Sequence, residues 1–216
     1  MSHKIYVACV RDEFQPYQAG LRTALTRRNC EVSFLEDLVA QDGDTLALLD
    51  RTIADCDSVL HLVGDMTGDH PSVRQIDGLR DRHPDFNSHF HNLADTIDAG
   101  AEIPYTQWAA WLALYHHKPL HIAQAHQDAR RVPQYLHSLA QTAHQAAHLH
   151  HLVHRHHRPG IEFRTASQLF DFATRSAMAQ HATTARSSAS VLLSVVGGVF
   201  TVLALVWLLR GYFVPG

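Results

Sequence analysis

The residues with the strongest claim on chemistry directly follow short apolar runs of the chain. They are Val10 to Phe14, Glu36 with Asp37, Gly64 to Gly68, and the start of the apolar segment at Tyr105. If these runs are strands of a parallel α/β sheet, ligands bind beyond their carboxyl ends, where such residues converge. Arg11 is suited to bind a phosphate or a ribose as a bidentate donor, although a surface arginine is the alternative. Asp37 and Asp65 also fit ordinary solvated turns.

A second set of chemistry-bearing residues is the histidine-rich stretch from residue 144 to residue 157. His144 with His148, and His150 with His154, are each four residues apart and could chelate a divalent ion from one helix face. The stretch has no cysteine beside it, and the sequence indicates no third ligand of fixed geometry. We therefore predict a solvated, histidine-rich helix face and no metal site.

The hydrophobic pattern predicts the elements that must position these residues. Strands are expected at Lys4–Cys9, Glu31–Leu35, Ser58–Val63, Pro119–Ala123 and Ile161–Phe163, and helices at Pro16–Arg28, Thr45–Ala54, Tyr105–His116, Pro133–His156 and Ser167–Gln180. The polar segment Met66–Gly100 is expected to be an insertion with weak helices. The alternation predicts an α/β fold with a flavodoxin-like parallel sheet of about five strands, right-handed crossovers and helices on both faces.

The most apolar segment is the uncharged run from Val191 to Leu209. At about 1.5 Å per residue it can cross the ~30 Å hydrocarbon core of a bilayer, and a buried core helix is the alternative. Basic residues precede it in excess, which favours a cytoplasmic N-terminal domain. We expect a single-pass membrane protein with an α/β domain over residues 1–180, a linker over 181–188, a transmembrane helix over 189–210 and a tail over 211–216.

Composition and spacing limit the partners. Lys and Arg number 18 against 21 Asp and Glu, a net charge of −3, which argues against a nucleic-acid partner. Ser190, Ser194 and Gly198 are spaced four apart in the apolar run, which would let two helices approach closely. The expected partners are membrane lipid and further copies of the chain.

Several segments together resemble bacterial Toll/interleukin-1 receptor (TIR) domains. They are Tyr6 to Phe14, Leu35 to Ala40, Asp55 to Asp57, His61 to Asp65, and Tyr105-Thr106-Gln107-Trp108 running to Lys118-Pro119. The resemblance covers roughly Lys4 to Arg175, and its last block is the most specific. It implies either hydrolysis of the bond between nicotinamide and ribose in NAD⁺, often in antiphage defence, or a signalling scaffold. NAD⁺ would be the substrate, and no separate cofactor is implied.

Position 109 departs from the family pattern. The family has a glutamate two positions after the residue matching Gln107, and this chain has Ala109 there. The glutamate stabilises positive charge at the ribose as nicotinamide leaves, which a methyl group cannot do. We therefore expect the chain as given to be nearly inactive. Retention of Gln107, Trp108 and Trp111 favours an inactivating substitution over a natural non-enzymatic domain.

The resemblance also implies a cleft. Position 109 would have the catalytic role, and the expected lining is Arg11, Asp12, Phe14, Asp37, Gly64, Tyr105 and Trp108. Trp108 could stack on a nicotinamide or adenine ring, but its spacing with Trp111 fits core packing equally well. The leading hypothesis is a membrane-anchored effector that hydrolyses NAD⁺ on assembly. The alternatives are a non-enzymatic membrane scaffold and a nucleoside deoxyribosyltransferase-like enzyme, which would need the same missing carboxylate.

Overall fold

The computed structural model describes residues 2–39, 43–90, 102–132 and 135–179 of the chain. The linker, transmembrane helix and tail expected after residue 180 lie outside these residues. Within the part that is described, no helix is long and apolar enough to cross a membrane.

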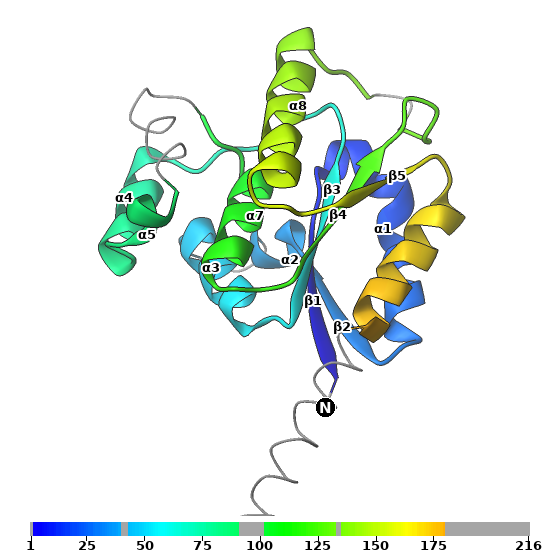
Figure 1. The fold of residues 1–216 in the computed structure, drawn as a ribbon, viewed down its shortest axis with the longest axis horizontal. Helices are drawn as coiled ribbons and strands as arrows, with labels where there is room; N and C mark the ends of the chain where they lie inside the picture. The colour runs from blue at the N-terminus through cyan, green and yellow to red at the C-terminus, as the bar shows by residue number, and fades with distance from the viewer. Residues whose placement is uncertain (1, 40–42, 91–101, 133–134, 180–216) are drawn as a thin grey trace, which may run out of the picture. The chain divides into compact units, whose positions relative to one another are not determined.

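Five parallel strands form the central sheet, in the order β2-β1-β3-β4-β5 (Figure 1). The strands are β1 (His3–Ala8), β2 (Cys30–Phe34), β3 (Ser58–Val63), β4 (Leu120–Ala125) and β5 (Gly160–Phe163). This order is flavodoxin-like and confirms the predicted five-stranded parallel α/β sheet. The change of direction at β1 and β3 is the point where such sheets bind ligands.

Helices cover both faces of the sheet (Figure 1). They are α1 (Arg11–Thr26), α2 (Leu35–Val39), α3 (Thr45–Asp55), α4 (Val73–Arg82), α5 (Phe86–His89), α7 (Tyr105–Tyr115), α8 (Leu139–His154) and a last helix over residues 166–179. α1 and the last helix pack on one face, and α3, α7 and α8 pack on the other. Successive side chains of a strand point to opposite faces of the sheet. Val59 therefore belongs to one buried core and Leu60 to the other.

Two predicted helix starts are wrong by more than one helical turn. The helix expected from Pro133 begins at Leu139, because Ser138 caps it through a reciprocal hydrogen-bond pair with Gln141. The helix expected from Pro16 begins at Arg11 and contains the proline. Burial of Phe14 and of neighbouring apolar side chains against the sheet outweighs the backbone hydrogen bond that the proline cannot donate.

Candidate functional site

A pocket of about 480 Å³ lies beyond the carboxyl ends of the first strands. It is lined by Cys9, Val10, Arg11, Asp12, Leu35, Glu36, Val39, Gly68, Asp69, Tyr105 and Thr106. These residues come from the β1–α1 junction, α2, the segment after β3, and the first turn of α7. The volume falls in the usual range for small-molecule sites, and the position matches the switch point of the sheet.

The amino ends of two long helices meet this pocket. α1 begins at Arg11 and α7 begins at Tyr105, and neither Val10 nor Pro104 caps its helix with a side-chain hydrogen bond. The first-turn N–H groups of an α-helix carry a partial positive charge and bind anions well. The N–H of Tyr105 already donates a hydrogen bond to the carbonyl oxygen of Asp69 at 3.0 Å. The other first-turn N–H groups, together with the Arg11 guanidinium, make this end of the pocket suitable for phosphate groups.

Acidic and apolar side chains complete the lining. Asp12, Glu36 and Asp69 bring carboxylates, which accept hydrogen bonds from sugar hydroxyls, while Leu35 and Val39 offer apolar surface. Gln18 fixes Glu36 by donating a hydrogen bond to its Oε1 at 3.1 Å. The lining therefore combines anion-binding, hydroxyl-binding and apolar parts.

Cys9 and Tyr105 are neutral parts of the wall. Burial raises the pKa of the Cys9 thiol to about 12, so this thiol is protonated at neutral pH and is a poor nucleophile. Burial also raises the pKa of Tyr105, whose hydroxyl donates a hydrogen bond to Gln75 Oε1 at 3.0 Å. Gln75 belongs to the first turn of α4, so α4 holds this tyrosine in place.

The segment after β3 needs glycine at two points to form its side of the pocket. Gly68 has a φ of +77° and lies against Val10, where an added Cβ would come within 3.2 Å of a methyl carbon. At Gly64 an added Cβ would lie 2.0 Å from Glu13 Oε1. The missing side chain at Gly64 lets the Glu13 carboxylate reach the backbone.

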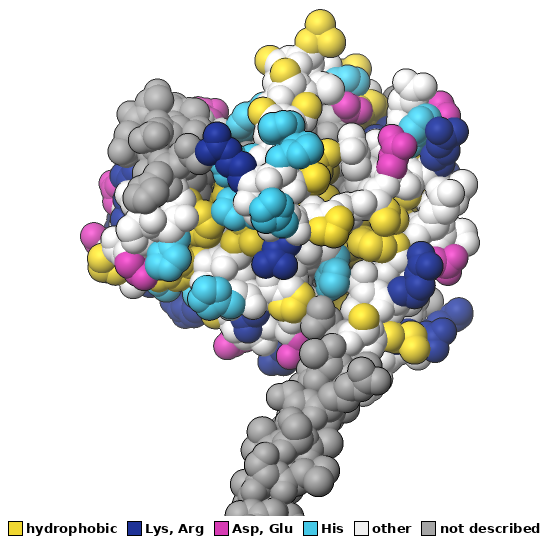
Figure 2. All heavy atoms as spheres, in the orientation of Figure 1, with side chains coloured by type: hydrophobic (Ala, Val, Ile, Leu, Met, Phe, Trp, Pro, Cys, Tyr) yellow, Lys and Arg dark blue, Asp and Glu magenta, His cyan; other side chains and the backbone are white. Residues whose placement is uncertain are grey.

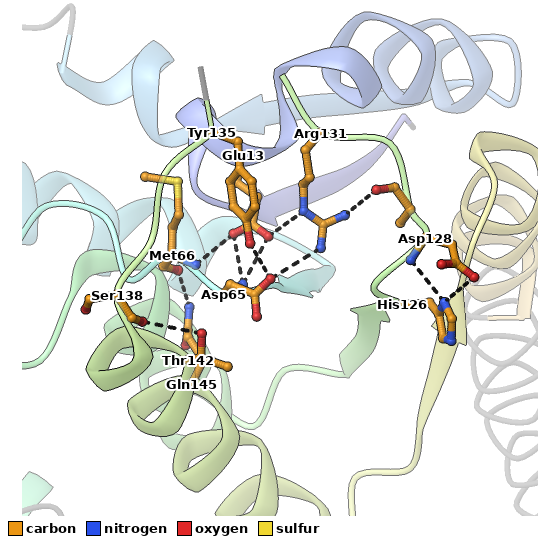
Figure 3. Close-up of polar contacts among 11 residues, drawn as sticks. Glu13, Asp65, Met66, His126, Asp128, Arg131, Tyr135, Ser138, Thr142 and Gln145 are labelled. Atoms are coloured by element: carbon orange, nitrogen blue, oxygen red, sulfur yellow. Dashed lines mark hydrogen bonds and ion pairs between the residues drawn. The ribbon is translucent and has the colours of Figure 1, made fainter. Parts of the chain in front are cut away.

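Glu13 is fully buried and holds the segment after β3 (Figure 3). Its carboxylate accepts hydrogen bonds from the N–H of Asp65 at 3.0 Å and from the N–H of Met66 at 2.9 Å. It also accepts one from Arg131 Nε at 2.8 Å. With a cation and two backbone donors on one carboxylate, Glu13 is a structural anchor and not a free acid or base.

Arg131 and Tyr135 extend this network from the loop before α8 (Figure 3). The Arg131 guanidinium lies over the rings of Phe14 and Tyr135, at 5.5 Å from each centroid. The Tyr135 hydroxyl donates a hydrogen bond to Asp65 Oδ2. Charge neutralisation and ring stacking thus fix Asp65 at the end of β3.

A chain of amides ties α7 and α8 to the same segment. Gln107 donates a hydrogen bond to Gln145 Oε1 at 3.0 Å, and Gln145 donates one to the carbonyl oxygen of Met66. Both glutamines are buried. Gln107, part of the most specific block of the resemblance, therefore positions the wall of the pocket without lining it.

The predicted site residues lie in four different places, and three of these are the pocket, the Glu13 network and the turn after β2. Arg11, Asp12 and Tyr105 line the pocket. Phe14 and Gly64 lie against the Glu13 network. Asp37 pairs with Arg22 at 2.8 Å and accepts a hydrogen bond from the backbone N–H of Phe34, which closes the turn after β2.

Trp108 and Ala109 lie in the core between the sheet and its helices. Trp108 is 1% exposed, and its ring is 5.8 Å from that of Phe86. Ala109 is 0% exposed and belongs to the same buried cluster. Neither residue is part of the pocket lining.

Five further residues line the pocket, and the sequence does not predict this position for them: Cys9, Leu35, Val39, Asp69 and Thr106. Leu35 and Val39 belong to α2, which the sequence did not predict. A helix of five residues leaves no hydrophobic period to detect. Asp69 lies in the segment Met66–Gly100, for which the sequence predicts only a polar insertion with weak helices.

Compared with known proteins, the chain matches no protein-family model and none of the curated protein sequences. The resemblance to TIR domains therefore rests on the residues quoted above. The structure adds to it an α/β fold with a parallel sheet of five strands.

Proposed function

We propose that the pocket binds NAD⁺, and that the chain hydrolyses NAD⁺ only when a glutamate replaces Ala109. One observation carries the proposal: two helix amino ends, Arg11 and three carboxylates surround a single pocket at the switch point of the sheet. A dinucleotide needs this combination, because its pyrophosphate is anionic and its riboses present hydroxyls.

The residue at position 109 should affect hydrolysis of NAD⁺ far more than binding of NAD⁺. The chain has no carboxylate at Ala109. Loss of one preorganised charged group typically costs about 10² to 10³ in rate, and it acts mainly on the transition state. We propose that the chain as given binds NAD⁺ and releases almost no nicotinamide.

The membrane setting belongs to the same proposal. The apolar run from Val191 to Leu209 supports a single membrane anchor with the α/β domain in the cytoplasm. Copies concentrated in two dimensions assemble more readily, which fits an effector that acts as a homo-oligomer. An antiphage role and the TIR family itself are supported by the resemblance of the sequence.

A non-enzymatic scaffold is the second candidate, and the burial of Ala109 favours it. The methyl group is fully enclosed in an apolar cluster, so a glutamate there needs space and a partner for its charge. A scaffold has no need of NAD⁺ at its pocket.

Two measurements on the membrane-reconstituted full chain decide between these candidates. The first is NAD⁺ affinity of the chain as given, of Arg11→Ala and of a matched control, Arg51→Ala, whose arginine is exposed on α3. We expect Arg11→Ala to weaken binding roughly 10-fold, because one charge-assisted hydrogen bond is lost, and the control to bind normally.

The second measurement is nicotinamide release by Ala109→Glu beside Ala109→Gln, which has the same shape without the charge. Only the glutamate form should release nicotinamide, by at least about 100-fold over the glutamine form. Thermal melts show whether each variant folds. Absence of NAD⁺ binding to the folded chain as given would exclude the nucleotide site and leave the scaffold.

A further inference from the structure

Asp50, His83 and His116 place three metal-ligating atoms together, outside the pocket. His83 Nε2 lies 2.8 Å from Asp50 Oδ2, and His116 Nε2 lies 2.8 Å from Asp50 Oδ1. The three ligand atoms all fall within 4.8 Å of one another. Both imidazoles thus present the same nitrogen to one carboxylate.

The three residues come from different parts of the helical layer. Asp50 lies in the middle of α3, His83 directly follows α4, and His116 directly follows α7. The Asp50 side chain is 6% exposed, while those of His83 and His116 are 20% and 18% exposed. The cluster is enclosed on the carboxylate side and open to solvent beside the rings.

We propose that Asp50, His83 and His116 bind one divalent transition metal ion of the zinc class. Two imidazoles and one carboxylate form a known donor set for such ions, with a water molecule in the fourth position. Metal bonds of about 2.0 to 2.1 Å place tetrahedral ligand atoms ~3.3 Å apart, so the two 2.8 Å contacts have to open by about half an ångström. The partly exposed rings have room to move by that amount.

The surroundings both support and oppose the ion. The ring of Tyr115 lies against His83 and His116, with centroid distances of 4.9 and 5.2 Å, and fixes their orientation. Its hydroxyl donates a hydrogen bond to Asp85, which adds a nearby negative charge. Arg82 opposes the ion, because its Nε lies 3.5 Å from Asp50 Oδ2. Arg82 is 36% exposed. It can therefore turn into solvent when a metal ion neutralises the Asp50 carboxylate in its place.

A bound ion would link α4 to α3 and α7. α4 ends next to His83, and its first turn holds Gln75, which fixes the pocket residue Tyr105. The ion would therefore stabilise the helix that positions one wall of the pocket. This inference does not depend on the identity of the ligand in that pocket.

Zinc binding to the full chain tests the site. Zn²⁺ is titrated against a competing chelator for the chain as given, for His83→Gln/His116→Gln, and for a matched control, His150→Gln/His154→Gln. The control removes the same number of histidines from the i, i+4 pair on α8, whose ring centroids are 4.4 Å apart. We expect one tight Zn²⁺ in the chain as given and in the control, and a loss of affinity of more than about 100-fold in the first variant.

A second variant tests the site by a new absorption band, and this test holds even if the double variant does not fold. His116→Cys should give a cobalt–thiolate charge-transfer band with Co²⁺ that the chain as given lacks, because only a coordinated sulfur produces it. Cys9, Cys30 and Cys56 are buried and supply the same background in both proteins. Equal zinc affinity in both double variants, or cobalt bound to folded His116→Cys without the band, would overturn the proposal.

Discussion

Two pairs of histidines in this molecule occupy opposite electrostatic settings. His61 and His148 face each other across the interface of β3 and α8, with their Nε2 atoms 3.2 Å apart and exposed fractions of 0% and 6%. His83 and His116 face the Asp50 carboxylate and are partly exposed. The first pair lies in an apolar core beside Trp111, and the second pair has a charged partner.

The settings give the two regions different protonation chemistry. Burial lowers the pKa of His61 to about 4. Burial also lowers the pKa of His148 well below its usual value, with an added effect from His61, His144 and His151. Burial alone would raise the pKa of Asp50, but hydrogen bonds from His116 and His83 lower it. The comparison shows that a buried imidazole pair without an anion stays neutral, whereas a shared carboxylate makes a pair suited to cations. Figure 2 shows other histidines gathered on the surface over α8.

The largest effect is expected from acid. Because His61 and His148 bind protons less readily when folded, unfolding takes up protons, and stability falls as the pH drops below about 6.5 towards 4. The loss should approach about 1.4 kcal/mol per pH unit for each ring. Urea midpoints followed by tryptophan fluorescence between pH 7 and pH 4 measure it.

The matched variant for the acid effect is His61→Leu/His148→Leu. Removing both rings removes the proton uptake and leaves no polar atom of the pair unsatisfied, so the midpoint should depend much less on pH. Asp50 affects stability in a lower pH range. Because its pKa is lowered from 3.8 in the folded chain, the stability that it contributes is lost only below pH 3.8. If the urea midpoint of the double variant depends on pH as steeply as that of the unsubstituted chain, the buried pair does not cause the acid effect.

Asp50→Ala should give the next largest effect. The substitution removes two hydrogen bonds of 2.8 Å from His83 and His116, and we expect a loss of about 2 to 3 kcal/mol at pH 7 after discounting the partly exposed rings. Asp77→Ala is the control, because Asp77 is 60% exposed and its ion pair with Arg80 is 3.8 Å long. Equal urea midpoints for the two variants would show that the buried carboxylate has no special role.

His148→Leu should have a smaller effect at neutral pH. It leaves the Nε2 atom of His61 buried without its 3.2 Å partner, at a cost of about 1 to 2 kcal/mol. Below pH 6 the difference from the unsubstituted chain should shrink, because one of the two proton-binding rings is gone. Urea midpoints at pH 7.5 and pH 5 measure both parts, and a difference that grows in acid would contradict the neutral pair.

The fold was accessible from the sequence because its signals are local. Ser58–Val63 was predicted to the residue as a strand, since six buried residues follow one another without interruption. Tyr105 was predicted as the start of α7, and the sheet follows from the alternation of such segments. The start of α8 was missed because Ser138 and Gln141 form a cap whose effect the apolar pattern does not contain.

The site was only partly accessible, because its residues meet through the topology. Arg11, Asp12 and Tyr105 follow from the rule that ligands bind at strand ends. Glu13 meets Arg131 across 118 positions of the chain, and Asp50 meets His116 across 66, so no local spacing reveals either contact. The sequence suggests two i, i+4 histidine pairs on α8. In the pair His144/His148, the His148 side chain is buried and contacts His61, so the two rings do not share one solvated face.

The smallest effect is expected at the other i, i+4 pair, His150 and His154. Both residues are exposed on α8, and although their rings are 4.4 Å apart, neither has a buried partner to lose. Glutamine is also a better helix former than histidine by a few tenths of a kcal/mol, which offsets the lost ring contact. We therefore expect His150→Gln/His154→Gln to change the free energy of unfolding by less than about 0.5 kcal/mol at pH 7. The steep acid dependence should also persist, because His61 and His148 are untouched. Urea titrations at pH 7 and pH 5 check both points. If this variant flattens the acid profile, proton uptake belongs to the surface of α8 and not to the buried pair.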